Sequence, residues 1–308
     1  MRVKDEFAND ARAWCGLNQP NKAEEEVDIV LFGIPFDQGV SYRAGASLGP
    51  SVLRQNTFTS TPCTERLEYM DELSVFDAGD FKEENREVLF QEIQSYVTDL
   101  VKKGIFFTAI GGDHSVTIPI EAGINDAISE PFGIIHIDAH MDLCDDMGGD
   151  KLSHGSVQRR ALELSNIEGT QNLYFIGIRS IEPDEYAFKK ENLIQVKTAY
   201  DCYHEGMEAI ARDVVEKMSK YNKVYITYDI DSLDPAYAAG TGTPQFGGIT
   251  SRDALELLRI LFEELNIIAF DIVEVAPPLD PSLTSMFAAR KLLTECWGHQ
   301  AKKIGKLK

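Results

Sequence analysis

Acidic and histidine side chains recur at every second position at two points in the sequence, each directly after an apolar run. The first group is Asp138, His140 and Asp142, and the second is Asp229 and Asp231. Successive side chains of an extended chain point to opposite faces, so a spacing of two places each group on one side. Carboxylates crowded on one face repel one another unless a cation lies between them. Because mixed nitrogen and oxygen ligands suit an ion such as manganese, the pattern predicts a metal centre. An acidic loop with a capping Asp is the alternative.

Two further segments place ionisable residues at the ends of apolar runs. Gly111 and Gly112 permit a sharp turn that presents His114, although a Gly-Gly-Asp-His sequence taken alone is more often an ordinary turn. Glu274 ends a run that predicts a buried strand, and a buried carboxylate needs a partner. Asp271, inside the same run, is expected to be structural. Since the carboxyl ends of parallel strands meet at one edge of a sheet, the four segments together predict a single site.

The elements that would position these residues follow from the apolar pattern. Continuously apolar runs are typical of strands covered on both faces, and their alternation with amphipathic segments favours a mostly parallel sheet with right-handed crossovers. The expected strands are 27–35, 73–79, 105–111, 132–138, 173–178, 193–196, 223–229 and 267–274. The expected helices are 84–103, 117–128, 155–164, 207–220, 251–264 and 281–296. No linker divides the chain, so a single domain is expected over residues 1–308.

The composition narrows the classes of partner. The chain carries 50 acidic and 30 basic residues, a net charge of −20, which disfavours nucleic acid and anionic membranes and suits metal ions and small cations. Five scattered cysteines without a CxxC spacing indicate reduced thiols rather than a disulfide framework. No apolar run has the length of a membrane span or the form of a secretory signal, so a cytoplasmic location is expected.

The chemistry-bearing segments resemble the signature sequences of the ureohydrolase family, which includes arginase and agmatinase, with agmatinase the more similar. The matching stretches are Gly111–Ser115, Asp138–Asp142, Ser153–Gly155 and Asp229–Pro235. The resemblance runs from about residue 27 to residue 295. It implies a three-layer α/β/α fold around a mostly parallel, eight-stranded sheet, and a centre of two manganese ions.

The resemblance also implies two ligand sets that share two bridging carboxylates. One ion would be held by His114, Asp138, Asp142 and Asp229. The other would be held by Asp138, His140, Asp229 and Asp231.

Three residues have catalytic roles by the same resemblance. Asp142 would relay the proton of a water molecule activated by the two ions. His154 would be a flexible histidine near the substrate that carries a proton, although a Ser-His-Gly turn can also be merely structural. Glu274 would hold a planar guanidinium group by paired, charge-assisted hydrogen bonds. Attack of water on the guanidinium carbon would then release urea and an amine.

The loop 143–152 bears on the choice of substrate. It contains three aspartates and no asparagine, so it would repel a carboxylate and suit a second cationic end. Agmatine, which would yield putrescine for polyamine synthesis, is therefore favoured, with Asp145 as a substrate-binding residue beside His154 and Glu274. Hydrolysis of guanidinobutyrate, guanidinopropionate, guanidine or arginine is the alternative, in which case Asp145 would only solvate the loop.

Two rival classes can be weighed against this interpretation. A catalytically inactive, metal-binding regulatory relative is disfavoured because every expected ligand is present, together with His154 and Glu274. A single-zinc deacetylase of related fold is disfavoured because the chain has no adjacent pair of histidines. Family members commonly form trimers or hexamers, so a homo-oligomer is expected by resemblance.

Overall fold

A computed structural model describes residues 1–308, and its centre is a nine-stranded sheet in the order β1-β3-β2-β4-β9-β8-β5-β6-β7. The strands are β1 (Arg2–Val3), β2 (Ile29–Gly33), β3 (Val75–Phe81), β4 (Phe107–Ile110), β5 (Gly133–Ile137), β6 (Leu173–Ile178), β7 (Gln195–Thr198), β8 (Val224–Asp229) and β9 (Ile267–Val273). All neighbours pair in parallel except β1, which lies antiparallel to β3. The eight expected strands are β2 to β9. The count of eight was one too low because β1 has two residues and no apolar run to mark it.

Nine α-helices connect the strands. They are α1 (Gly49–Gln55), α2 (Arg86–Lys102), α3 (Thr117–Ala127), α4 (Val157–Ala161), α5 (Pro183–Glu191), α6 (Ala199–Glu205), α7 (Met207–Met218), α8 (Ser251–Glu264) and α9 (Thr284–Lys303). The six expected helices correspond to α2, α3, α4, α7, α8 and α9. Local chemistry sets several starts: the side chain of Asn85 caps α2, and that of Thr250 caps α8. No helix is both long and apolar enough to span a bilayer.

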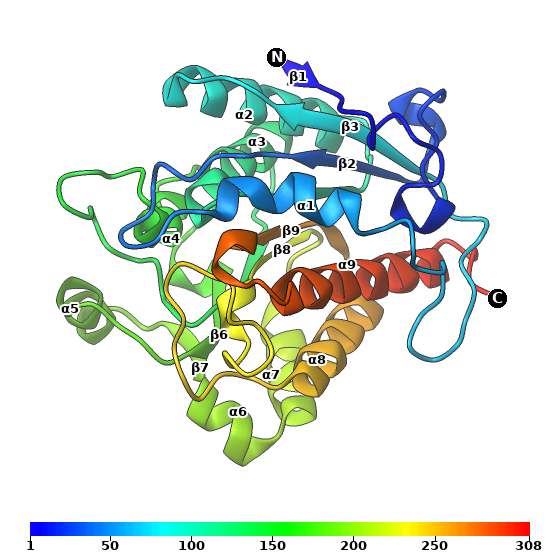
Figure 1. The fold of residues 1–308 in the computed structure, drawn as a ribbon. Helices are drawn as coiled ribbons and strands as arrows, with labels where there is room; N and C mark the ends of the chain where they lie inside the picture. The colour runs from blue at the N-terminus through cyan, green and yellow to red at the C-terminus, as the bar shows by residue number, and fades with distance from the viewer.

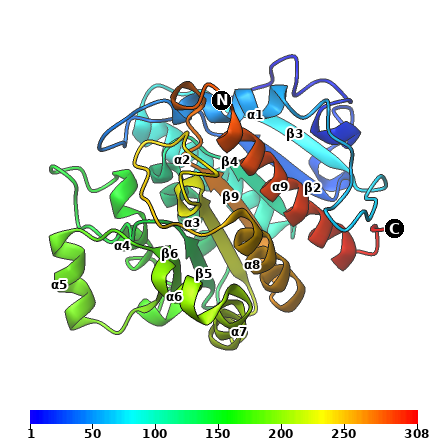
Figure 2. The same cartoon turned by 60° about the horizontal axis from the view of Figure 1, so that its bottom comes forward.

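Two apolar clusters cover the faces of the sheet and give the molecule three layers (Figures 1 and 2). Helices α2, α3 and α4 contribute buried side chains to one cluster, and α1, α6, α7, α8 and α9 contribute to the other. Helix α5 lies at the periphery in both views. Its only buried residue is Glu185, and the partly buried Phe188 is its apolar contact with one of the two clusters.

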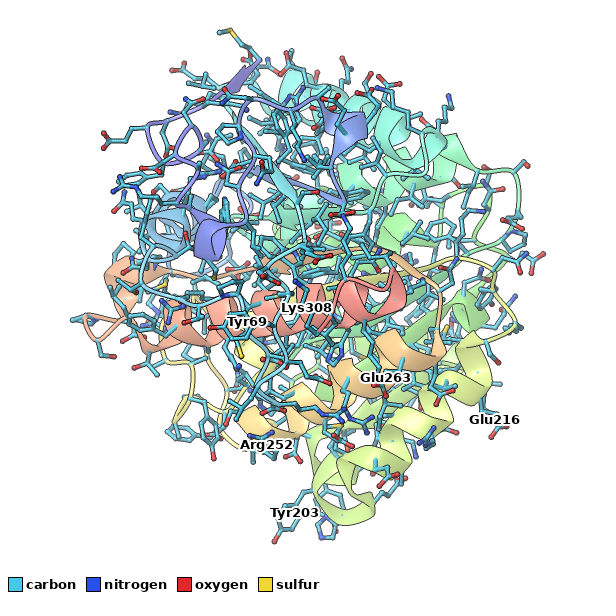
Figure 3. All side chains as sticks on the ribbon, turned by 90° about the vertical axis from the view of Figure 1, so that its right-hand side faces the viewer. Tyr69, Tyr203, Glu216, Arg252, Glu263 and Lys308 are labelled. Atoms are coloured by element: carbon cyan, nitrogen blue, oxygen red, sulfur yellow. The ribbon has the colours of Figure 1, made fainter.

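The C-terminal tail is bound along the surface of the molecule (Figure 3). The backbone groups of Lys308 and Tyr69 exchange two hydrogen bonds of 2.8 and 2.9 Å, and the ammonium of Lys306 lies 2.7 Å from Asp28. The tail therefore ties the end of the chain to the loop before β3.

The strand order explains why distant segments meet. Strands β4, β9, β8 and β5 are consecutive neighbours at the centre of the sheet, and all four run in the same direction. Each is followed by one of the four segments that concentrate ionisable residues. The carboxyl ends of these strands therefore bring the segments to one edge of the sheet.

Candidate metal centre

The Gly111-Gly112 turn brings three strand ends into close contact. A Cβ atom on Gly112 would lie 1.8 Å from the carbonyl oxygen of Phe36, so no other residue fits there. The carbonyl of Gly112 accepts a hydrogen bond of 2.8 Å from the backbone N–H of Glu274, and Asp113 N–H donates to Phe36. The turn thus locks the ends of β2, β4 and β9 together, with His114 directed into the edge of the sheet.

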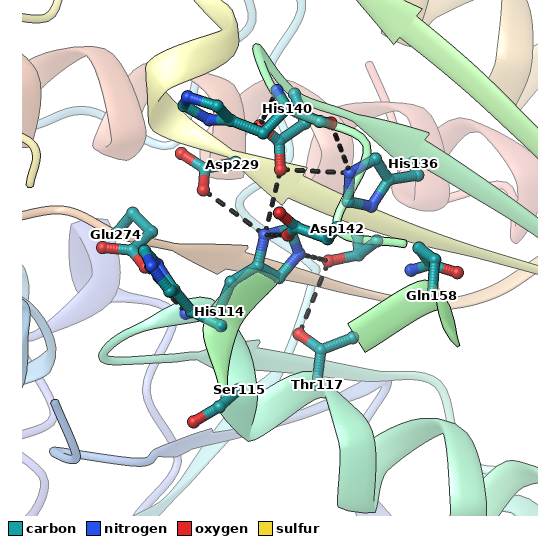
Figure 4. A network of polar contacts seen from close by, with 12 residues as sticks. His114, Ser115, Thr117, His136, His140, Asp142, Gln158, Asp229 and Glu274 are labelled. Atoms are coloured by element: carbon teal, nitrogen blue, oxygen red, sulfur yellow. Dashed lines mark hydrogen bonds and ion pairs between the residues drawn. The ribbon is translucent and has the colours of Figure 1, made fainter. Parts of the chain in front are cut away.

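Three carboxylates surround one nitrogen of His114. Its Nδ1 atom lies 3.0 Å from Asp138 Oδ2, 3.0 Å from Asp142 Oδ2 and 3.3 Å from Asp229 Oδ2. Figure 4 shows His114, Asp142 and Asp229 converging from segments at the ends of three different strands. His114 and the three aspartates are buried. These are the four residues expected to hold the first ion.

A second group adjoins the first. His140 Nδ1 lies 3.4 Å from Asp138 Oδ1 and 3.2 Å from Asp231 Oδ2. Asp138 thus offers one oxygen to each group, as a bridging carboxylate would. Asp229 reaches the first group in this arrangement, and its Oδ1 accepts the backbone N–H of Asp231.

The donor set fits a divalent cation. On its far side, His114 Nε2 lies 2.8 Å from Thr227 Oγ1, and Thr117 donates onward to Asp271 at 2.6 Å. A hydrogen on Nε2 leaves Nδ1 as a bare lone pair facing three carboxylates, and Nδ1 indeed makes no hydrogen bond. Asp138 Oδ2 is likewise buried without a hydrogen-bond partner. Convergent oxygen and nitrogen lone pairs with no hydrogen between them are the arrangement that a metal ion stabilises.

The pKa shifts of the clustered residues also indicate a site for a cation. Burial, followed by the nearby charges of Asp231 and Asp138, raises the pKa of Asp229 well above its usual value. Burial opposes a charged His114 ring, but the adjoining carboxylates of Asp138 and Asp142 raise the pKa of that imidazole. The group therefore carries a deficit of positive charge that protons or cations must fill.

Two residues of the site adopt a backbone conformation that non-glycine residues rarely visit. Asp142 has a φ of 51° and Glu274 a φ of 63°. Such a conformation costs roughly 1–2 kcal/mol at each residue. Backbone hydrogen bonds hold both: Gln158 N–H donates to the carbonyl of Asp142, and Glu274 N–H donates to Gly112. These unfavourable backbone conformations lower the stability of the fold, and they direct the two carboxylates to the edge of the sheet.

His154 and Glu274 form a pair next to the ligands. Their Nδ1 and Oε1 atoms lie 3.0 Å apart, and the backbone N–H of His114 also donates to this Oε1, at 2.9 Å. On the other side of the ring, Ser41 places its N–H 3.0 Å and its hydroxyl 2.8 Å from Nε2. Burial opposes the charged ring, but contact with Glu274 raises the pKa of His154 to about 9. Nδ1 therefore carries the hydrogen that faces Glu274, and on the charged ring the hydroxyl oxygen of Ser41 can accept the hydrogen of Nε2.

A cavity of about 150 Å³ opens onto this group. Its lining comprises Ser41, His140, Asp142, Cys144, Met147, His154, Gly155, Ser180, Ile181, Glu182, Glu185, Asp229, Thr243 and Gln245. Four of these carry carboxylates and none is Lys or Arg. Burial raises the pKa of Glu185 to about 7, although the backbone N–H groups of Glu182 and Leu143 donate to it and oppose the rise.

The structure assembles most of the expected site residues but not Asp145. Its carboxylate is exposed, lies 3.0 Å from Arg160 and 3.5 Å from Lys151, and is not part of the cavity lining. Glu274 is buried behind His154 rather than in the lining.

The lining residues that the sequence interpretation did not predict include Ser41, Glu182 and Glu185. The two glutamates follow β6 in a segment with several acids, and no spacing there distinguishes a cavity residue from a solvated one. Their position after a predicted parallel strand was the one available signal.

Fold and geometry together define the class: a three-layer α/β/α protein whose sheet edge carries a cluster of His and Asp that can bind metal ions. The model of the arginase family matches residues 27–298, and the chain belongs to this family.

Individual relatives agree. The agmatinase of Bacillus subtilis is 38% identical over 278 residues, covering 88% of this chain and 91% of the relative. The mitochondrial guanidino acid hydrolase of Homo sapiens is 35% identical, covering 88% of this chain and 78% of the relative. Among solved structures, the agmatine ureohydrolase of Thermoplasma volcanium has a TM-score of 0.82 at 31% identity, covering 93% of this chain and 94% of that one. The protein is therefore a ureohydrolase, an enzyme that hydrolyses C–N bonds of guanidino compounds.

Proposed function

We propose that this enzyme hydrolyses agmatine to putrescine and urea with two manganese ions. The observation that carries the choice of substrate is the cavity lining, which has four carboxylates and no Lys or Arg. Agmatine is a dication, with a guanidinium at one end and an ammonium at the other. An anionic cavity favours both ends, whereas a guanidino acid would bring a carboxylate to a wall without a cation.

The guanidinium end is assigned to Glu274. One oxygen of Glu274 receives hydrogen bonds from His154 and His114, and no protein group donates to the other, Oε2. A planar guanidinium can donate in parallel to a carboxylate, and it would replace the contact with His154. The ammonium end is assigned to Glu182 and Glu185, which lie in the lining on the loop and helix after β6.

The reaction adds water to the guanidinium carbon and breaks its bond to the alkyl nitrogen. Two divalent ions would supply the positive charge that lowers the pKa of a water molecule toward neutrality. Asp142, which lines the cavity, accepts the proton of the attacking water. Glu274 fixes the plane of the guanidinium, and His154, released from Glu274, delivers a proton to the departing amine nitrogen.

The identity of the ions rests on ligand chemistry. The two candidate groups combine carboxylate oxygens with the nitrogens of His114 and His140. Mixed, oxygen-rich ligation suits manganese, and Asp138, which contacts both groups, supports a bridged pair of ions.

The quaternary and cellular setting belong to the same proposal. We infer a homo-oligomer, a trimer or a hexamer, which light scattering of the purified enzyme would measure directly. All five cysteines are unpaired, which supports a reducing compartment such as the cytoplasm as the place of action.

The test is urea release from manganese-loaded protein with agmatine, arginine, guanidinobutyrate, guanidinopropionate and guanidine as substrates. We expect kcat/KM for agmatine to exceed that for guanidinobutyrate by at least about a hundredfold, because one desolvated charge contact contributes roughly 3 kcal/mol. Preference for a guanidino acid would overturn the choice of agmatine. Absence of urea from all five would overturn the catalytic mechanism.

Two variants locate the ammonium site. Glu182→Gln should raise KM for agmatine about tenfold and should not raise KM for guanidinobutyrate, because only agmatine has an ammonium for Glu182 to bind, whereas the carboxylate of guanidinobutyrate is repelled by Glu182. Asp145→Asn is the matched control: its carboxylate pairs with Arg160 outside the lining, so its removal should leave both KM values unchanged. If Asp145→Asn raised KM for agmatine and Glu182→Gln did not, the ammonium would be assigned to Asp145 instead.

A further inference from the structure

His136 contacts three residues of the centre without belonging to the expected ligand set. It lies in β5, its ring is buried, and its Nε2 is 3.1 Å from Asp138 Oδ2. The same Nε2 is 3.1 Å from the backbone carbonyl oxygen of His140. Its ring also stacks on that of His114, with centroids 5.0 Å apart and planes 6° from parallel (Figure 4).

The contacts fix which nitrogen carries the hydrogen. A backbone carbonyl only accepts hydrogen bonds, so Nε2, facing His140 O, must be an N–H. The other nitrogen, Nδ1, is buried and has no partner, and a hydrogen there would be an unsatisfied buried donor. A nitrogen that carries a hydrogen has no lone pair for a metal, so this Nε2 cannot be a ligand. Its hydrogen is donated to the His140 carbonyl, and Asp138 Oδ2 lies 3.1 Å from the same nitrogen without a hydrogen bond of its own.

The ring has little freedom to move from this position. His114 stacks on it, and the edge of Phe175 lies against it, with centroids 5.3 Å apart. The pairing of β5 with its two neighbouring strands places His136 opposite Phe175 of β6 and opposite Thr227 of β8. Since Thr227 also contacts His114 Nε2, the same two strands position both imidazoles.

We propose that His136 is a positioning residue of the metal centre, which fixes the turn that presents His140 by the hydrogen bond to its backbone carbonyl and holds an N–H beside the Asp138 carboxylate. The inference rests on the metal centre of the proposed function. It predicts that His136 acts through the hydrogen on Nε2, beyond the volume of its ring. Groups that orient metal ligands by hydrogen bonds commonly change metal affinity about 10- to 100-fold when removed.

Three substitutions separate the hydrogen bond from the packing. His136→Phe keeps a ring between His114 and Phe175 but has no donor. His136→Gln places an amide N–H near the position of Nε2, so it can restore the bond to the His140 carbonyl. His136→Asn is the matched control, because its shorter amide reaches only the position of Nδ1, which faces no partner.

The experiment measures Mn²⁺ affinity of the metal-free proteins by competition with a chelating dye, and bound manganese at saturation by elemental analysis. Circular dichroism of each metal-free variant reports folding. We expect affinity to fall about 10- to 100-fold in His136→Phe and His136→Asn, with recovery to within a few-fold of wild type in His136→Gln. The number of ions bound at saturation should remain that of wild type.

Two outcomes would overturn the inference. Wild-type affinity in His136→Phe would show that the hydrogen bond has no role. Loss of one ion at saturation would make His136 a ligand. If the wild-type protein itself bound no Mn²⁺, the proposed function would fail, and that result differs from either of the others.

Discussion

Glu185 is the buried carboxylate of the cavity whose charge changes near neutral pH. Burial raises its pKa to about 7, so the side chain is charged above that pH and neutral below it. A neutral Glu185 cannot attract an ammonium group.

We therefore expect KM for agmatine to rise about tenfold as the pH falls from about 8 to about 6, with the midpoint near 7. Steady-state kinetics over this range checks the prediction. Guanidinobutyrate is the control: it meets the same ions and the same Glu274 but has no ammonium, so its KM should not rise on acidification. A parallel rise for both substrates would trace the effect to protonation of metal ligands instead.

The positions of some site residues could be predicted from the sequence, whereas that of Asp145 could not. The spacing of Asp138, His140 and Asp142 predicted a shared face, and the structure brings all three to the same edge. Asp145 was expected to bind substrate from the composition of its loop alone. Composition does not fix the direction of a side chain, and the partner that draws Asp145 away, Arg160, comes from α4.

At the scale of elements, Asp271 links two strands and a helix behind the metal centre. Its buried carboxylate accepts hydrogen bonds from Thr117 of α3, from the Tyr225 hydroxyl of β8 and from the backbone N–H of Tyr228. Through Thr117 it also lies behind the Thr227 hydroxyl that contacts His114.

Asp271→Asn should destabilise the fold by about 2–4 kcal/mol, because an amide nitrogen would meet a donor where the carboxylate accepted one. Urea unfolding of the metal-free protein measures the change. Tyr225→Phe removes one donor and leaves the carboxylate its other two, so its cost should be smaller, about 1 kcal/mol. Equal stability of wild type and Asp271→Asn would show that the network contributes no net free energy.

Strands and helices were predictable from the sequence where they are long enough to show an apolar run or a helical period. Strands β2 to β6, β8 and β9 are almost entirely buried and lie in mostly apolar runs, whereas the edge strand β7 is only partly buried. Helices α1 and α6 have seven residues each, too few for a helical period to emerge from the sequence. Helix α5 buries only Glu185, so it has no apolar stripe to detect.

At the scale of the whole molecule, the candidate ligands join segments that are far apart in the chain. They follow β4, β5 and β8, three of the four central strands, and Glu274 follows the fourth, β9. An ion bound among them binds the folded chain and not the unfolded one, because the unfolded chain does not hold these side chains together.

Removal of metal should therefore lower the thermal stability of the entire domain. Binding at a free concentration of about 100 times Kd stabilises the folded state by roughly 3 kcal/mol per site. For a chain of this size, two sites correspond to a shift in Tm of roughly 10 °C. Calorimetry with excess Mn²⁺ and after chelation measures the difference.

In Asp229→Asn most of the shift should vanish, because this carboxylate belongs to both proposed ligand sets. His154→Asn should keep the full shift, since His154 contacts Glu274 and Ser41 rather than the proposed ligands' side chains. A Tm that does not respond to chelation in wild type would contradict the role of the ions in joining the four central strands.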